Sequence, residues 1–117
     1  MTNTLAPFTP ATLTRAELDA LAGATVVEFG TNWCGYCRRA QPLITEAFAG
    51  YEGLPKHEAF RLLKVEDGPG QPLGRSFGVK LWPTLVFMRD GVELAKLVRP
   101  EDAAQIRQAL ERLAPAP

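Results

Sequence analysis

Two cysteines, Cys34 and Cys37, are separated by two residues and are the only cysteines of the chain. A disulfide between them would close a very short loop, and such a loop removes little entropy from the unfolded chain. A bridge would therefore stabilise little as a structural element. Two thiols at this spacing are well placed for exchange, because one can attack a foreign disulfide and the other can resolve the mixed disulfide that forms.

The predicted surroundings of the cysteines favour this chemistry. They follow a β-branched run over residues 25–29, which has the pattern of a buried strand, and they come at the start of a helix expected over residues 38–48. The first turn of a helix has unpaired backbone donors and a partial positive charge, which stabilise a thiolate. We therefore expect Cys34 to be the nucleophile, exposed at the helix start, and Cys37 to be the resolving thiol one turn inward.

A metal site is the competing interpretation of the cysteine pair. A tetrahedral zinc site needs four ligands, and the chain offers Cys34, Cys37 and a single histidine, His57. An intramolecular site is short of ligands, so no metal is predicted, and a metal shared between two copies of the chain is the remaining alternative. His57 falls in a polar connection over residues 53–58 and is expected to be a solvated loop residue.

The length of 117 residues suits one compact domain over residues 1–117. Thirteen basic and thirteen acidic residues leave a net charge of zero, so neither nucleic acid nor an anionic membrane is expected as a partner. No apolar run is long enough to span a bilayer, and the N-terminus lacks the pattern of a secretory signal. We therefore expect a cytoplasmic protein, where a close cysteine pair is more often catalytic or metal-binding than structural.

Helices and strands are predicted to alternate, between an irregular arm over residues 1–13 and a frayed tail over residues 114–117. Helices are expected over residues 14–22, 38–48 and 73–77, and from Pro100 onward, with Ile106, Leu110 and Leu113 on the inner face of the last one. Strands are expected over residues 25–29, 60–65, 85–88 and 92–98. Thr14 and Glu17 form a capping box, and Asp90-Gly91 is a strong hairpin signal. This order predicts an α/β fold, in which a mixed β-sheet has helices on both faces.

The segment Trp33-Cys34-Gly35-Tyr36-Cys37 resembles the Trp-Cys-Gly-Pro-Cys active site of the thioredoxin family. Further matches follow in the family's order. Glu28 lies where thioredoxins have a buried acid, Pro42 matches a helix-kinking proline, and Trp82-Pro83-Thr84 looks like the cis-proline segment opposite the active site. The resemblance extends from about Val26 to the C-terminal helix and implies a thioredoxin fold.

The resemblance also implies a thiol–disulfide oxidoreductase. Such a protein would reduce or exchange disulfides of protein substrates through the Cys34–Cys37 dithiol, without a bound cofactor and as a monomer. Its electrons would come from an upstream reductase or a small thiol. The alternatives are a disulfide isomerase or oxidant with a less reducing potential, and a non-enzymatic binding or redox-sensing module with the same fold.

Two residues behind the cysteines are implied to relay a proton. Burial in an apolar strand would raise the pKa of Glu28, and the resemblance implies that Glu28 accepts the proton of Cys37, with Lys64 as its neighbour on the next strand. The competing interpretation is that Glu28 lies on a solvent face or at a sheet edge.

The substrate-binding residues implied by the resemblance surround the dithiol: Trp33, Gly35, Tyr36, Trp82 and Pro83. Pro83 is expected to be cis, so that its turn presents the Trp82 backbone to an extended substrate; a trans turn is the alternative. Trp33 is expected either to shield the cysteines or to pack ordinarily, and Trp82 either to contact substrate or to enter the core. Val98-Arg99-Pro100 replaces the glycine-containing turn that thioredoxins commonly have near the substrate groove.

Overall fold

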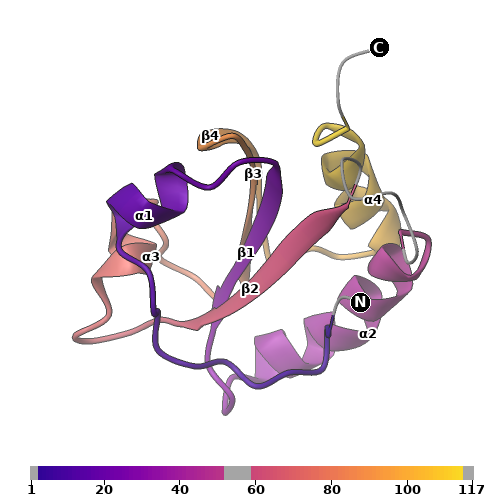
Figure 1. Ribbon diagram of the computed structural model, residues 1–117. Helices are drawn as coiled ribbons and strands as arrows, with labels where there is room; N and C mark the ends of the chain where they lie inside the picture. The colour runs from indigo at the N-terminus through magenta and orange to yellow at the C-terminus, as the bar shows by residue number, and fades with distance from the viewer. Residues whose placement is uncertain (1–2, 52–58, 115–117) are drawn as a thin grey trace.

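A computed structural model describes residues 3–51 and 59–114 and contains one four-stranded sheet (Figure 1). The strand order is β2-β1-β3-β4. The strands are β1 (Ala24–Gly30), β2 (Phe60–Glu66), β3 (Thr84–Arg89) and β4 (Val92–Val98). β1 pairs in parallel with β2 and antiparallel with β3, and β3 pairs antiparallel with β4. The predicted mixed sheet is confirmed.

Within the described residues, four helices flank this sheet: α1 (Arg15–Asp19), α2 (Gly35–Ala49), α3 (Pro72–Ser76) and α4 (Ala103–Glu111). One buried cluster joins α2 and α4 to one face of the sheet, and a second joins α1 and α3 to the other face (Figure 1). The prediction of helices on both faces is therefore confirmed. Ile106, Leu110 and Leu113 are buried in the first cluster, as their spacing predicts.

The central strand β1 directs the side of the sheet that carries Glu28 toward α2. All seven of its residues are buried, because it is hydrogen-bonded on both sides and covered on both faces. Side chains alternate along a strand. Val26 belongs to the cluster shared with α2 and α4, whereas Val27 and Phe29 belong to the opposite cluster. The same alternation directs Glu28 and Gly30 toward α2.

Two helix starts differ from the sequence-based prediction because side-chain caps decide them. α2 begins at Gly35, not at residue 38, since Cys34 is its N-cap and accepts a hydrogen bond from the backbone N–H of Cys37. α4 begins at Ala103, not at Pro100, since the Asp102 side chain caps it. In both cases a polar side chain satisfies a backbone donor that the helix itself leaves unpaired.

The first helix begins as predicted and ends early. The Thr14–Glu17 capping box is present in both directions. α1 ends at Asp19, three residues before the predicted end. Gly23, with a φ of 80°, belongs to the turn into β1, and its N–H donates to Asp90 Oδ1 at 2.7 Å. Because Gly23 is hydrogen-bonded to the β3–β4 hairpin, the chain leaves the helical path before it reaches this residue.

The β3–β4 hairpin has the predicted turn. Asp90 and Gly91 have φ values of 51° and 81°, the positive values that a two-residue hairpin turn of this kind requires. Residues 53–58, including His57, and residues 115–117 lie outside the described part of the chain. Within the described residues, no helix is long and apolar enough to cross a membrane.

The described part of the N-terminal arm, residues 3–13, is anchored at both the sheet edge and the loop before α2. Thr9 bridges to Val65 of β2, and its carbonyl accepts a hydrogen bond from the Glu66 N–H at 2.8 Å. The Asn32 side chain bonds both backbone groups of Phe8, at 2.8 and 3.0 Å. The arm thereby covers part of the outer edge of β2 and buries Phe8.

Candidate active site

The two thiols lie together in the first turn of α2, and both are free. Cys34 Sγ accepts the hydrogen bond of the Cys37 N–H at 3.2 Å. Cys34 is 6% exposed and Cys37 is 2% exposed. The expectation of an exposed Cys34 is therefore wrong. Phe8 and both cysteines form one buried cluster, and Trp82 packs against it, so aromatic rings cover a helix start that would otherwise face water.

The Cys37 thiol strongly retains its proton. Burial raises the pKa of Cys37 to about 12, and the neighbouring Cys34 and Glu28 contribute in the same direction, whereas a backbone contact with Thr31 acts against them. A buried thiol of this kind does not ionise by itself at neutral pH. It becomes a nucleophile only when an adjacent group accepts its proton.

Glu28 is an unsolvated carboxyl at the centre of the sheet. It has no exposed surface and lies between Lys64 on β2 and Leu85 on β3, so a solvent face and a sheet edge are both excluded. Neither carboxyl oxygen has a hydrogen-bond partner among the described residues. Burial raises the pKa of Glu28 from 4.5 to about 7, with the Lys64 ammonium opposing the rise. Both protonation states of Glu28 are therefore populated at neutral pH.

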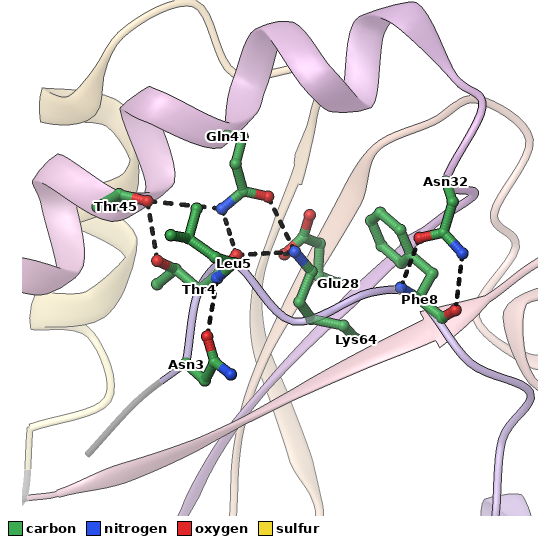
Figure 2. A network of polar contacts seen from close by, with 9 residues as sticks. All are labelled: Asn3, Thr4, Leu5, Phe8, Glu28, Asn32, Gln41, Thr45 and Lys64. Atoms are coloured by element: carbon green, nitrogen blue, oxygen red, sulfur yellow. Dashed lines mark hydrogen bonds and ion pairs between the residues drawn. The ribbon is translucent and has the colours of Figure 1, made fainter.

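Lys64 lies near Glu28 but donates its hydrogen bonds to other groups (Figure 2). Its Nζ lies 3.9 Å from Glu28 Oε1, and it donates at 2.8 Å to both the Thr4 carbonyl and Gln41 Oε1. Burial lowers the pKa of Lys64 against the opposing effect of Glu28. The predicted Glu28–Lys64 pair is therefore present, but as an ion pair without a direct hydrogen bond.

The arm closes over this pair, as Figure 2 shows. Thr4 is buried, its carbonyl also accepts a hydrogen bond from Gln41 Nε2, and its hydroxyl lies 2.8 Å from the Thr45 hydroxyl. A cavity of about 460 Å³ lies between the arm and α2, with Cys37, Gln41 and Lys64 in its lining. Sequence reasoning missed Gln41 and Thr4. The available signal was the spacing of four residues from Cys37 to Gln41, which puts both on one face of a helix.

The outer side of the dithiol carries exposed aromatic rings. Trp33 is 70% exposed and Tyr36 is 48% exposed, while Gly35 between the cysteines is also exposed. The Trp33 and Trp82 rings pack edge to face, with 5.6 Å between their centres. Ordinary core packing of Trp33 is therefore excluded. Trp82 is half-buried, and its indole N–H donates to Asp67 Oδ2 at 2.8 Å, so it is partly a core residue and partly a surface residue.

The Trp82–Pro83 peptide bond is cis, the geometry that the resemblance implies. The Trp82 carbonyl is not free, because Arg99 Nε donates to it at 2.8 Å. The backbone N–H of Arg99 donates to the Pro83 carbonyl at 2.9 Å, and its guanidinium carbon lies 3.7 Å from the centre of the Tyr36 ring. Arg99 thus connects the cis-proline turn to the first turn of α2, a contact that sequence reasoning missed.

The part of the chain that the structure describes contains no group of three or more His, Cys, Asp or Glu side chains able to hold a metal ion. The arrangement brings together two thiols, one carboxyl and one ammonium. Cys34 faces an aromatic surface, while Cys37 faces Glu28 and Lys64 inside. Of the implied substrate-side residues, Trp33, Gly35 and Tyr36 are exposed, whereas the side chains of the implied relay residues, Glu28 and Lys64, are buried.

Comparison with known proteins agrees with this geometry. Residues 9–112 match the Thioredoxin family. The reduced structure of thioredoxin 2 from Pseudomonas aeruginosa PAO1 is similar, with 52% identity, a TM-score of 0.79 and coverage of 93% of this chain and 95% of that chain. A thioredoxin from Staphylococcus aureus is 26% identical over 102 residues, 86% of this chain and 93% of that protein.

A second kind of relative is much longer than this chain. Protein disulfide-isomerase A2 from Pongo abelii is 37% identical over 92 residues, which are 76% of this chain and 17% of that protein. The similarity therefore concerns about a sixth of the isomerase. Together, the fold, the paired thiols in the first turn of α2 and the match over residues 9–112 show that the chain belongs to the thioredoxin family of thiol–disulfide oxidoreductases.

Proposed function

We propose that this chain reduces disulfide bonds of protein substrates through Cys34 and Cys37. The observation that carries the proposal is the asymmetry of the two thiols. Cys34 caps α2 beside an exposed aromatic surface, whereas Cys37 is the more buried thiol, with a pKa raised to about 12 and Glu28 behind it. This asymmetry supports Cys34 as the thiol that attacks the substrate and Cys37 as the thiol that acts after it.

The reaction has two exchange steps. The Cys34 thiolate attacks one sulfur of the substrate disulfide, whose S–S bond breaks, and the other substrate sulfur leaves as a thiolate that takes up a proton. The Cys37 thiol then gives its proton to the Glu28 carboxylate, and the Cys37 thiolate attacks Cys34 Sγ. The second substrate sulfur leaves, and a Cys34–Cys37 disulfide forms. The substrate gains two electrons, and the chain loses two.

Glu28 suits the proton-accepting role because its pKa, raised to about 7, lies near neutral pH. A carboxyl with an ordinary pKa would be a weak base for a thiol with a pKa of about 12. Lys64 lies 3.9 Å away and provides positive charge as Glu28 exchanges its proton. We assign both residues to this relay.

Reduction is proposed as the net direction, with an upstream reductase or a small thiol restoring the dithiol. The similarity to a thioredoxin over nearly the full length of both chains supports this choice. The second candidate is disulfide isomerisation, which the similarity to part of a protein disulfide-isomerase favours. The two differ in reduction potential, which is about −270 mV for thioredoxin and about −180 mV for protein disulfide isomerase. Equilibration of the dithiol with a glutathione buffer measures it.

Turnover assays with two variants test the thiol roles. With dithiothreitol as the donor and insulin as the disulfide substrate, we expect Cys34→Ser to abolish reduction. Cys37→Ser should accumulate a mixed disulfide with the substrate, which mass spectrometry detects, because the resolving thiol is lost. The reverse pattern would exchange the two roles. A folded wild-type protein without turnover would favour the non-enzymatic alternative, a binding or redox-sensing module.

A further inference from the structure

A strained arginine lies beside the proposed substrate surface. Arg99 follows β4 and has a φ of 49°, a positive value that residues other than glycine adopt infrequently. Its backbone is held there by the hydrogen bond from its N–H to the Pro83 carbonyl. Because strained backbone persists where the surrounding structure requires it, such a residue is a candidate for a functional role.

The Arg99 side chain joins two features of that surface. Its Nε donates to the Trp82 carbonyl at 2.8 Å, and its guanidinium stacks over the Tyr36 ring at 3.7 Å. The Arg39 guanidinium lies 5.0 Å from the centre of the same ring. Among residues 3–51 and 59–114, neither guanidinium forms an ion pair with a carboxylate. Within these described ranges, two guanidinium groups without an acidic partner therefore lie over one exposed ring, that of Tyr36, two residues after Cys34 in the chain.

We propose that Arg99, assisted by Arg39, is a specificity-determining residue. It selects disulfide-bonded polypeptides that carry an aspartate or glutamate beside the cysteine that Cys34 attacks. This inference rests on the proposed function and deepens it by naming the substrate class. Its basis is charge complementarity: a guanidinium has several N–H donors in a planar fork, and a carboxylate is the group that matches them.

Arg99 also controls a backbone acceptor. In the free protein its Nε is hydrogen-bonded to the Trp82 carbonyl, and the Trp82 side chain packs against the cluster that contains the dithiol. A partner carboxylate that draws the guanidinium away leaves this carbonyl open to a backbone N–H of the partner. The carbonyl then exchanges one hydrogen bond for another. A neutral partner must displace Arg99 from the carbonyl without offering the guanidinium a charged acceptor, which is less favourable.

Three peptide disulfides test the proposal. They are identical except for Glu, Gln or Lys beside the attacked cysteine, and kcat/KM is measured for each with dithiothreitol as the donor. For the wild type we expect Glu to exceed Gln about fivefold, the factor that corresponds to an exposed ion pair of about 1 kcal/mol. Lys should be the poorest substrate. The preference should shrink at high salt, because exposed charges are screened.

Substitutions at Arg99 test whether this residue causes the preference for the Glu peptide. Arg99→Gln should bring the Glu-to-Gln ratio close to one. Arg99→Gly, which adopts a positive φ without strain, should do the same. Arg38→Gln is the matched control, because Arg38 is an exposed neighbour whose guanidinium bonds the Asn32 carbonyl at 3.3 Å instead. It should retain the ratio.

The outcomes distinguish charge selection by Arg99 from the proposed disulfide reduction on which it rests. Equal rates for the three peptides in the wild type, or a ratio that survives both Arg99 variants, would overturn the charge selection while leaving disulfide reduction intact. Absence of turnover with every peptide would refute the proposed function, and the charge selection with it. A fivefold ratio that only the Arg99 variants remove supports the assignment.

Discussion

Replacing Glu28 by glutamine should make the stability of this protein much less dependent on pH. Glu28 is fully buried, and neither of its oxygens has a hydrogen-bond partner among the described residues. Glutamine has nearly the same shape but does not ionise. The change therefore removes the titration of one carboxyl while keeping its volume, so the comparison of the two proteins isolates the charge.

The size of the effect follows from linkage. The pKa of Glu28 rises from its ordinary value of 4.5, taken for the unfolded chain, to about 7 in the folded protein. Between these two pKa values the folded state binds more protons than the unfolded state, so stability falls as pH rises through this window. At about 1.4 kcal/mol per pKa unit, the loss is below about 1 kcal/mol at pH 5 and about 3 kcal/mol at pH 8.

Urea denaturation of both proteins at pH 5 and pH 8 measures this loss. The stability of Glu28→Gln relative to the wild type should be greater at pH 8 than at pH 5 by about 2–3 kcal/mol. Other groups that titrate in this range cancel in the difference, because both proteins contain them. Glu46→Gln, on the exposed side of α2, is the control and should not reproduce the pH dependence.

A catalytic readout accompanies the stability measurement. If Glu28 accepts the proton of Cys37, Glu28→Gln should leave the first attack by Cys34 nearly unchanged and slow the resolution of the mixed disulfide. A stability difference that is the same at both pH values would refute the reasoning. It would mean that Glu28 is solvated, or firmly paired with Lys64, and the proton relay would lose its physical basis.

Two further predictions concern the surroundings of this carboxyl. Gln41→Leu removes one hydrogen-bond acceptor of Lys64, so Lys64 should pair more closely with Glu28 and thereby lower the pKa of Glu28. The stability that this variant loses between pH 5 and pH 8 should then be smaller than the loss in the wild type. An equal loss would show that Gln41 does not hold Lys64 away from Glu28. Gly30→Ala would add a methyl group 2.6 Å from Cys37 Sγ. The free energy of unfolding, measured by urea denaturation, should fall by about 1–3 kcal/mol, and resolution of the mixed disulfide by Cys37 should slow. Wild-type stability of this variant would contradict the close packing.

Local patterns predicted most of the elements. The β-branched run of β1, the Thr14–Glu17 capping box and the Asp90-Gly91 turn all depend on residues within a few positions of one another, and all three are present. The helix starts were less predictable. The start of α4 depends on whether Pro100 is its first residue or Asp102 is its N-cap, and both residue types are common at these positions.

The chemistry of the thiols was also visible in the sequence, but their environment was not. The spacing of Cys34 and Cys37 after a strand predicted disulfide exchange. Their burial depends on Phe8 and Trp82, which lie 26 residues before and 48 residues after Cys34 in the chain. No local pattern links such distant segments.

By itself, the sequence determined the fold class, the dithiol and the placement of an acid in the strand before it, because periodicity, spacing and motif are properties of neighbouring residues. Only the tertiary structure decided that Lys64 donates hydrogen bonds to Thr4 and Gln41, whereas neither carboxyl oxygen of Glu28 has a hydrogen-bond partner among the described residues. Only the tertiary structure decided, too, that Arg99 donates a hydrogen bond to the Trp82 carbonyl. The physical reason is that the solvation of a buried charge, and the partner of a surface charge, depend on every atom within a few ångströms. Those atoms come from parts of the chain that only folding brings together.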